Sequence, residues 1–574
     1  MTIHQLLKNY WGYDQFRPLQ EEIIQSVIDG KNTLAILPTG GGKSICYQIP
    51  GLYKPGICLV VSPLIALMKD QVFQLRKRGI TAFAIYAGMT RKEVIQTLET
   101  AAHSNCKFLY ISPERLSSSN FIQYIQHLPI DLIAVDEAHC ISQWGYDFRP
   151  AYLKIAGIKE LFPEAAMIAL TASATPNVQQ DICAQLGFED TQVFKKGFFR
   201  PNLIYRVKES NDKINHLIQL INHVNGSCII YCRNRRKTKF IADILLQNNI
   251  SAHFYHAGLA QEVRDQRQED WIKDKVPVMV CTNAFGMGID KPNVRLVIHI
   301  DLPECIENYY QEAGRAGRDE QPAWAVLLYD QQDLSDLKEQ VEKRFPPLEE
   351  VRTMYKSLMN HLQIPINYGK GHYYKIDLTT FVKNFNLDAF KITHGLKLLE
   401  QEGYLSFNEQ VFTPSKVIFV ADREWLREFQ EKDEALSKLI GNLLRHYEGI
   451  YDVETAIHEK TIAYWLKTDE VTIRQQLKQL AFYGIIEYHP VENTPQVYLL
   501  EDRVALEAVT IQQELFDFRK EQFAQRTSAM TEYATQQKHC RSKFISNYFG
   551  EKLTQDCDVC DVCKKKIKSR QLQD

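Results

Sequence analysis

Long apolar runs are absent from this 574-residue chain, and no stretch approaches the roughly 18 apolar residues of a membrane-spanning helix. The segment from Met1 to Trp11 also has no apolar core of the kind that signal peptides contain. Neither charge sign is in excess, because the formal net charge at pH 7 is −2. Whole-chain attraction to a polyanion is therefore excluded, and any nucleic-acid surface must be local.

The composition is that of a multidomain globular protein. Hydrophobic residues make up 45% and charged residues 24% of the chain, which is ordinary for a globular protein. At 574 residues, the chain is too long to form a single hydrophobic core. Thirteen cysteines without a secretion signal indicate a reducing compartment, so we expect a cytoplasmic protein. Nine cysteines are scattered through apolar runs, and four cluster near the C-terminus.

A glycine-rich turn follows the first predicted strand. Backbone N–H groups of such a turn can surround phosphates, with Lys43 reaching the terminal phosphates and Ser44 holding Mg²⁺. The residues predicted to bind phosphate are Thr39, Gly40, Gly41, Gly42, Lys43 and Ser44. Leu37 stands where the strict motif has its first glycine, so a glycine-rich turn without a ligand remains an alternative.

Two adjacent acids end a later apolar strand. Asp136 is placed to hold Mg²⁺, and Glu137 to orient or deprotonate an attacking water. Two acids at a strand end are often only solvated. Together with the glycine-rich turn, however, they predict Mg²⁺-dependent hydrolysis of a nucleoside triphosphate.

Apolar strands alternate with amphipathic segments up to about residue 328, which predicts parallel sheets covered on both faces. The length fits two sheets, lobe one and lobe two, with a nucleotide cleft between them. The predicted strands include Thr33–Ile36, Ile57–Val61, Phe108–Ile111, Leu132–Val135, Met167–Leu170, Cys228–Tyr231, Val278–Cys281 and Leu296–Ile300.

Lobe two carries residues that can act on phosphate. Gln311, Arg315 and Arg318 lie within about one helical turn of each other, and an arginine from a second lobe can stabilise charge on a γ-phosphate. Surface ion pairing is the alternative for such arginines. A glycine-punctuated turn containing Gly288 and Asp290 either binds phosphate or only turns the chain.

An aromatic-rich loop, residues 140–150, follows the two acids. Trp144, Tyr146 and Phe148 offer faces for base stacking, and Arg149 offers charge for a phosphate backbone. The alternative is that these aromatic residues pack into the core of lobe one.

The β/α alternation stops near residue 345. Two segments there repeat one another, each an amphipathic helix that ends at a glycine, Gly403 or Gly484, and is followed by a short strand. Both are predicted to be winged-helix-like units, with a hairpin wing over residues 485–499 of the second. Such units bind duplex DNA or only pack domains together.

The four C-terminal cysteines, Cys540, Cys557, Cys560 and Cys563, have the spacing C-x16-C-x2-C-x2-C. Four thiolates fit a closed tetrahedral zinc site, and an iron–sulfur cluster is the alternative.

Together these segments resemble the RecQ family of superfamily 2 DNA helicases, over roughly residues 3 to 330 and again around the four cysteines. The resemblance implies that Gln20 reads adenine with Arg17 beside it. It also assigns Gly288 and Asp290 to nucleotide binding. The residues that it implies in DNA binding or coupling are Ser62, Pro63, Gln143, Trp144, Tyr146, Phe148, Arg149 and His256.

The resemblance further implies ATP, Mg²⁺ and zinc as ligands and 3′-to-5′ travel on single-stranded DNA, with unwinding of duplex in DNA repair and recombination. Single-strand-binding and repair proteins are implied partners. The order departs from the family pattern, because about 200 residues separate lobe two from the cysteines. An RNA helicase, a translocase that does not separate strands, and a winged-helix regulator with an idle nucleotide site remain alternatives.

The predicted fold is α/β, with two RecA-like parallel-sheet lobes, two winged-helix-like units and a small helical zinc-binding subdomain. The predicted boundaries are 1–200 and 201–344 for the lobes, 345–425 and 426–507 for the winged-helix-like units, 508–566 for the zinc subdomain and 567–574 for a disordered basic tail.

Overall fold

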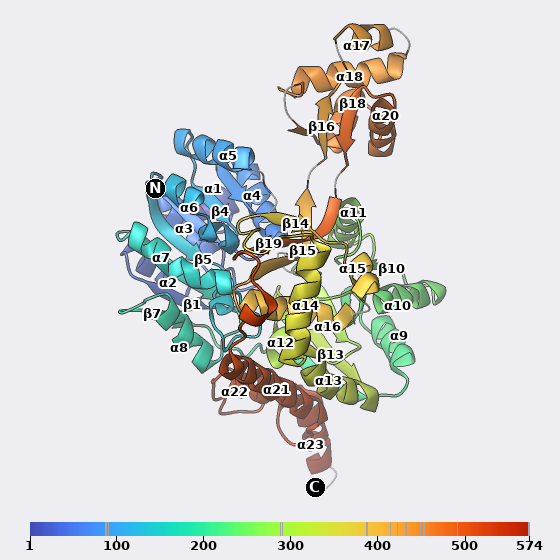
Figure 1. The fold of residues 1–574 in the computed structure, drawn as a ribbon. Helices are drawn as coiled ribbons and strands as arrows, with labels where there is room; N and C mark the ends of the chain where they lie inside the picture. Colours follow the sequence, from blue (N-terminus) through green and yellow to red (C-terminus); the bar gives the residue numbers. More distant parts are fainter. Residues whose placement is uncertain are drawn as a thin grey trace. The chain divides into compact units, whose positions relative to one another are not determined.

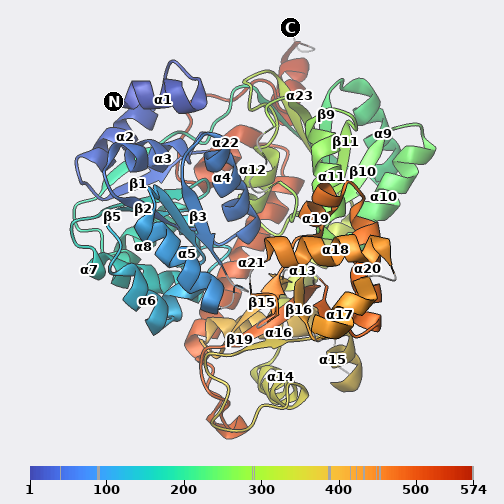
Figure 2. The same ribbon diagram turned by 90° about the horizontal axis from the view of Figure 1, so that it is seen from above.

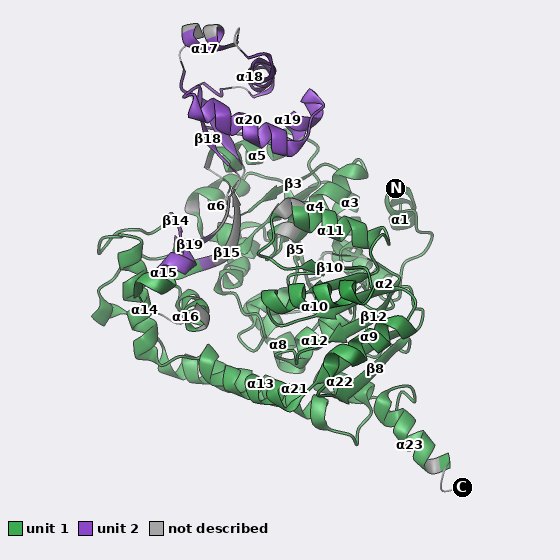
Figure 3. Cartoon of the chain, turned by 90° about the vertical axis from the view of Figure 1, so that its right-hand side faces the viewer, with its two compact units in different colours: residues 1–372, 382–406, 499–574 green, residues 373–381, 407–498 purple. Residues whose placement is uncertain are grey.

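The computed structural model describes residues 1–38, 40–86, 89, 91–286, 289, 291–385, 389–413, 415–421, 423–430, 433–447, 449–451, 454–490 and 492–571. The chain forms two compact units (Figure 3). Unit 1 comprises residues 1–372, 382–406 and 499–574, and unit 2 comprises residues 373–381 and 407–498. Among the helices of the described residues, none is long and apolar enough to cross a membrane.

Lobe one of unit 1 is built on a seven-stranded parallel sheet with the order β3-β4-β2-β5-β6-β1-β7. Its strands are β1 (Thr33–Ile36), β2 (Ile57–Val61), β3 (Ala82–Ile85), β4 (Phe108–Ile111), β5 (Ile130–Val135), β6 (Ala166–Thr171) and β7 (Gln192–Lys195). Its helices are α1 (Ile3–Trp11), α2 (Gln20–Ile28), α3 (Ile45–Tyr53), α4 (Ile65–Lys77), α5 (Arg91–His103), α6 (Ser119–Ile125), α7 (Ile155–Leu161) and α8 (Pro176–Gln185). The central strands are buried along their whole length, as expected for a sheet covered on both faces.

Lobe two is a six-stranded parallel sheet with the order β10-β11-β9-β12-β13-β8. Its strands are β8 (Leu203–Glu209), β9 (Ser227–Tyr231), β10 (Ala252–Tyr255), β11 (Val278–Cys281), β12 (Val294–His299) and β13 (Ala323–Tyr329). Its helices are α9 (Lys213–His223), α10 (Arg235–Gln247), α11 (Gln261–Ile272), α12 (Ile306–Ala313) and α13 (Gln331–Arg344). Figure 2 shows the strands of the two lobes as separate blue and green groups. Two parallel sheets were predicted, and this prediction is confirmed.

Three C-terminal helices of unit 1 lie against lobe two (Figure 1). They are α21 (Gln513–Thr535), α22 (Arg541–Tyr548) and α23 (Asp561–Gln571). Phe549 stacks on Phe198 with ring centroids 4.4 Å apart, and Tyr533 packs against Tyr309 at 5.2 Å. The cysteine-bearing segment therefore returns to lobe two after the long intervening region, because its helices need apolar cover. The predicted disorder of the tail is wrong for residues 567–571, which continue α23.

Unit 1 also contains α14 (Leu348–His361) and α16 (Ala389–Gln401), which pack on each other. Helix α15 (Leu378–Phe385) lies between them in the chain and spans the division between the units.

Unit 2 contains two small sheets. The first has the order β14-β19-β15, from β14 (Tyr373–Lys375), β15 (Leu405–Thr413) and β19 (Glu492–Leu499). The second has the order β17-β16-β18, from β16 (Lys416–Phe419), β17 (Thr455–Ala456) and β18 (Ile486–His489). Its helices are α17 (Arg423–Gln430), α18 (Glu434–His446), α19 (Glu459–Leu466) and α20 (Glu470–Phe482), which share an apolar core with the second sheet.

The strand pairing corrects the predicted wing. Strand β18 pairs antiparallel with β16, which precedes the helices in the chain, whereas β19 pairs with β14 and β15. The predicted hairpin over residues 485–499 is therefore wrong. The prediction rested on two short apolar runs on either side of a turn, which is a local pattern. In the structure, each of these runs pairs with a strand from elsewhere in the chain.

Strands β15 and β19 are neighbours, and everything between them forms an insertion. Leu500 N donates to Tyr404 O at 3.1 Å, which joins the residue after β19 to the residue before β15. The two strands thus run antiparallel, as in a hairpin. The described residues between 415 and 490, with the second sheet of unit 2, occupy the place of the hairpin loop. The predicted domain boundaries remain a prediction.

Candidate functional site: a nucleotide pocket between two lobes

The phosphate-loop residues connect β1 to α3, and two of their glycines have backbone conformations that other residues avoid. Gly40 has φ +78° and Gly42 has φ +76°. A Cβ on Gly42 would lie 2.2 Å from Gln20 Nε2, so a side chain there would displace Gln20. Ser44 precedes the first residue of α3, and its side chain does not cap the helix. Thr39 lies outside the described residues.

Arg17 and Gln20, implied in adenine recognition, contact this loop directly. The Arg17 guanidinium donates to Gly40 O. Gln20 Nε2 donates to Gly42 O at 3.0 Å and to Gly41 O at 3.3 Å, and the Gln20 side chain is buried. The family resemblance implies that both residues lie beside the adenine base of the nucleotide. The structure shows contacts with the loop, and their role in base recognition remains a prediction.

The two acids lie at the carboxyl end of β5, beside the loop. Burial, together with the charge of Glu137, raises the pKa of Asp136 to about 7, and Lys43 opposes this shift. Glu137 has φ +47°, and its Oε2 atom is buried without a hydrogen-bond partner among the described residues. Two half-buried carboxylates, one of them with a buried oxygen that accepts no hydrogen bond among the described residues, suit a divalent cation and an attacking water, and these roles remain a prediction.

His139 was not assigned a role from sequence, yet it lies next to Glu137. Its Nδ1 atom is 3.3 Å from Glu137 Oε2 but makes its hydrogen bond with Thr171 Oγ1, at 3.0 Å. Burial lowers the pKa of His139, so the ring is neutral near pH 7. Its position two residues after Glu137 was visible in the sequence, but its contact with β6 was not.

The two arginines of lobe two have different environments. The Arg318 side chain crosses to lobe one, where a Cβ on Gly40 would lie 2.8 Å from Arg318 Cδ. Arg318 Nη1 donates to Ile289 O at 2.6 Å. Arg315 is only 7% exposed and donates to Gly286 O, within lobe two. Arg318 is therefore the arginine that meets the phosphate loop.

Gln311 also joins the lobes, because its Nε2 atom donates to Ser173 Oγ of lobe one at 2.9 Å. Gly288 and Asp290 lie outside the described residues. A pocket of about 590 Å³ collects the loop, the acids and the arginines, and its size is that of a small-molecule site. Its lining includes Arg17, Gln20, Gly40, Gly42, Lys43, Ser44, Asp136, Glu137, Gln311, Arg315 and Arg318.

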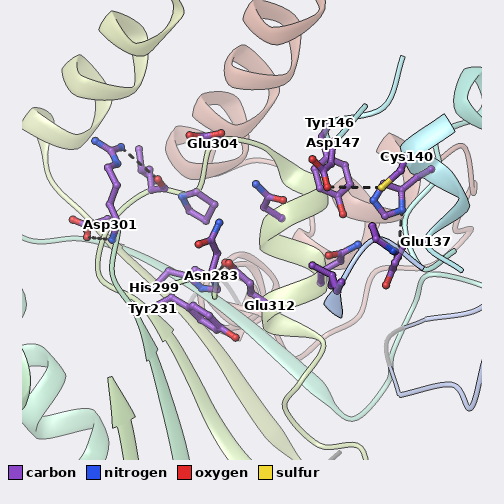
Figure 4. Close-up of a pocket in the computed structure, with 18 of the residues that line it drawn as sticks. Glu137, Cys140, Tyr146, Asp147, Tyr231, Asn283, His299, Asp301, Glu304 and Glu312 are labelled. Carbon is purple, nitrogen blue, oxygen red and sulfur yellow. Dashed lines mark hydrogen bonds and ion pairs between the residues drawn. The ribbon is translucent and has the colours of Figure 1, made fainter. Parts of the chain in front are cut away.

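A second pocket of about 400 Å³ opens from Glu137 toward the aromatic-rich loop. Lobe one contributes the labelled residues Glu137, Cys140, Tyr146 and Asp147, and lobe two contributes Tyr231, Asn283, His299, Asp301, Glu304 and Glu312 (Figure 4). The Tyr146 ring stacks on His139 with centroids 4.7 Å apart. Through Tyr146, the loop thus contacts His139, the residue that lies next to Glu137.

Two aromatic side chains of the loop, Trp144 and Phe148, contact helix α21 rather than lobe one. Trp144, 38% exposed, meets Phe518 of α21 edge to face at 4.7 Å. Phe148 lies under the Arg519 guanidinium at 5.8 Å. The predicted alternative, packing into the core of lobe one, does not describe these contacts. Phe518 and Arg519 were missed from sequence, because they lie far from the loop along the chain.

The other residues implied in DNA contact each have different surroundings. Arg149 pairs with Asp147 at 3.3 Å and donates to Pro63 O at 3.2 Å. Ser62 is buried, and its Oγ has no hydrogen-bond partner among the described residues. His256 stacks on Phe254, and Gln143 lines a small pocket beside the loop. Their contact with DNA remains a prediction.

The four C-terminal cysteines form one cluster, with Sγ atoms within 4.8 Å of one another. Backbone N–H groups point at the sulfurs: Cys557 N at Cys540 Sγ, 3.3 Å, and Cys560 N at Cys557 Sγ, 3.4 Å. Four converging thiolates with N–H donors fit a closed tetrahedral metal site.

The fold and the site define a two-lobed P-loop protein of the helicase class. The chain matches four family models: DEAD/DEAH box helicase over residues 17–182, helicase conserved C-terminal domain over 212–320, RecQ helicase winged-helix domain, Bacteroidota, over 417–490, and RecQ zinc-binding over 500–564.

Three relatives illustrate the similarity. The ATP-dependent DNA helicase RecQ of Haemophilus influenzae is 45% identical over 338 residues, which cover 59% of this chain and 55% of that protein. The RecQ of Bacillus subtilis is 44% identical over 360 residues, covering 61% of each. The probable ATP-dependent DNA helicase RecS of Bacillus subtilis is 41% identical over 343 residues, covering 59% of this chain and 69% of that protein.

The chain belongs to the RecQ family of DNA helicases, and the resemblance stated from sequence is confirmed. The cysteine cluster falls in the RecQ zinc-binding match, which favours zinc over an iron–sulfur cluster. The alignments cover a little over half of the length of the first two relatives described.

Proposed function

We propose that this chain is an ATP- and Mg²⁺-dependent DNA helicase that moves 3′ to 5′ on single-stranded DNA and unwinds duplex during repair or recombination. The observation that carries the proposal is the meeting of Arg318 from lobe two with Gly40 of the phosphate loop in lobe one. A site completed only when two lobes meet can couple nucleotide hydrolysis to lobe movement.

The residues of this chain divide the chemistry among them. The loop from Gly40 to Ser44, which includes Lys43, would hold the phosphates. Asp136 would orient a bound Mg²⁺. Glu137, with its unused buried acceptor, would orient the attacking water or take its proton. Arg318 would stabilise charge on the γ-phosphate, while Arg315 positions the turn at Gly286.

Two metal ions have different roles in this proposal. Bound Mg²⁺ supplies charge neutralisation at the β- and γ-phosphate oxygens. Zinc would be held by Cys540, Cys557, Cys560 and Cys563 and would only stabilise the fold around them. None of the thirteen cysteines forms a disulfide in the part of the chain that the structure describes, which supports a reducing, cytoplasmic location, where DNA-processing proteins are the expected partners.

Strand displacement on tailed duplexes tests the motor and its direction together. We expect ATP-dependent unwinding of a 3′-tailed duplex and none of a 5′-tailed one, with ATP hydrolysis stimulated by single-stranded DNA. Lys43→Ala should abolish both activities. Glu137→Gln should keep ATP binding but lower turnover by about 10²–10⁴-fold.

Glu160→Gln, on the exposed surface of lobe one, is the matched control for Glu137→Gln and should behave as wild type. Stimulation by an RNA oligonucleotide of the same sequence, with none by DNA, would favour an RNA helicase instead. DNA-stimulated hydrolysis without strand displacement would reduce the proposal to a translocase. Sequence-specific duplex binding that ATP does not affect would favour the regulator.

A further inference from the structure

A small pocket of about 60 Å³ lies beside the aromatic-rich loop, and Glu137 is not among its lining residues. Four parts of unit 1 line it: the loop, the end of α13, helix α16 and helix α21. Helices α13 and α21 pack on each other, as Figure 3 shows. The pocket is too small for a nucleotide and has room for one small group.

The lining is cationic. Arg344, Lys397, Arg519 and Arg526 all reach it, and the described residues that line it include no aspartate or glutamate. Arg344 and Arg519 do have acidic partners outside the lining, Glu304 at 2.6 Å and Glu402 at 2.9 Å. Within the described structure, no ion pair involves Lys397 or Arg526, so the pocket retains positive charge.

Two guanidinium N–H groups beside the pocket have no acceptor. Arg519 is only 7% exposed, and its Nε atom is buried without a hydrogen-bond partner among the described residues. The Nε atom of Arg526 is in the same state, although its Nη1 atom donates to Trp144 O at 3.2 Å. Buried donors without acceptors are rare in folded proteins, because each has lost its hydrogen bond to water without gaining another.

His394 reports the same positive environment. Burial, followed by the charges of Arg344 and Lys397, lowers the pKa of His394 to about 3. The carboxylate of Glu304 opposes this shift, and the neutral ring adds no charge to the pocket. The aromatic faces of Tyr146 and Phe148 complete the lining from the loop.

We propose that this pocket binds a phosphate group and so ties the aromatic-rich loop to α16 and α21. Arginine side chains suit this ligand, because a guanidinium presents several donors to phosphate oxygens. Two sources share this chemistry: a phosphodiester of a bound nucleic-acid strand and free inorganic phosphate. The nucleic-acid source rests on the proposed function, whereas binding of inorganic phosphate does not.

The first experiment measures the affinity of the full-length protein for a fluorescent single-stranded DNA across a salt series. Lys397→Gln alters an exposed side chain and should leave the fold intact, and Arg526→Gln alters a donor. Each variant should bind DNA more weakly, and the slope of log K against log salt should become shallower by about 0.7 per lost phosphate contact.

Matched controls are available on the same helices. Lys391→Gln on α16 breaks an ion pair with Glu350, and Lys520→Gln on α21 breaks one with Glu342. Neither residue lines the pocket, so neither control should change the salt slope.

The second experiment adds inorganic phosphate at constant ionic strength and follows thermal unfolding. Phosphate should raise the thermal midpoint of the wild type and of both controls, but not of Arg526→Gln or Lys397→Gln.

If phosphate has these effects on the thermal midpoint but the pocket variants leave the salt slope of DNA binding unchanged, the site is supported and its ligand is free phosphate. Stabilisation by phosphate in a protein that binds no DNA would support the site and defeat the proposed function. Pocket variants that match their controls in both arms would overturn the phosphate site.

Discussion

At the scale of single residues, two arginines three positions apart have opposite surroundings. Arg318 reaches out of lobe two to Gly40. Arg315 is buried and holds Gly286, which has φ +118° and could not carry a side chain there without meeting the guanidinium. Both arginines line the pocket of about 590 Å³, but Arg318 contacts the phosphate loop and Arg315 contacts the turn at Gly286.

This difference predicts a split between activity and stability. Arg318→Ala should lower ATP turnover by about 10³-fold or more while leaving the thermal midpoint nearly unchanged. Arg315→Ala should leave Gly286 O without its donor and destabilise the protein by about 1–3 kcal/mol. Turnover at saturating ATP and thermal unfolding, measured on both variants, check the split. Equal loss of turnover with no loss of stability in Arg315→Ala would contradict it.

At the scale of elements, the 23-residue helix α21 connects the metal cluster to the aromatic-rich loop. Its buried stripe includes Phe516, Arg519, Phe523, Met530 and Tyr533. The C-terminal half packs on α12 through Tyr533, and the other end meets Trp144 through Phe518. One continuous helix therefore contacts α12 near its C-terminal end and the aromatic-rich loop near its other end.

Cys560→Ser should remove the bound metal and loosen this end of the helix. The zinc content should fall from about one atom per chain to well below one, because three thiolates leave the site open. The thermal midpoint should drop, and proteolysis should become faster after residue 535. Cys183→Ser, a half-buried cysteine outside the cluster, should retain the metal. Zinc measurement on both variants decides the outcome, and full zinc in Cys560→Ser would refute the assigned ligand.

At the scale of the whole molecule, the chain carries one folded segment inside the hairpin of β15 and β19. The second sheet of unit 2 and helices α17–α20 have their own apolar core, which includes Val417, Leu439, Ile473 and Ile486. A segment that enters and leaves through neighbouring strands, with its own core, can be removed without breaking the chain path of the rest.

Replacing residues 414–491 by Asn-Gly should close β15 and β19 as an ordinary hairpin. We expect the shortened chain to fold and to keep its ATPase activity. Its thermal unfolding should lack one transition, that of the inserted segment. Calorimetry and an ATPase assay measure this, with Lys43→Ala in the shortened chain as the inactive control. A shortened chain that fails to fold would show that the segment is required by unit 1.

Where the sequence predicted well, the signal lay in adjacent residues. The strands Thr33–Ile36, Ile57–Val61, Phe108–Ile111 and Val278–Cys281 were predicted with the bounds that the structure has. A continuous apolar strand is typical of a sheet covered on both faces, so the alternation of apolar runs with amphipathic segments indicated the parallel lobes. The predicted wing failed, because two neighbouring short strands can pair with each other or with distant strands, and local sequence does not distinguish these outcomes.

The sequence by itself determined the glycine-rich loop before α3, the acids after β5 and the four-cysteine cluster, because each depends on spacing along a short stretch of chain. Only the tertiary structure decided which arginine meets Gly40, that Phe518 covers Trp144, and that α16 and α21 line one cationic pocket. These residues are brought together by the packing of elements that are remote in the chain, and that packing depends on the shape of whole apolar surfaces rather than on any local pattern.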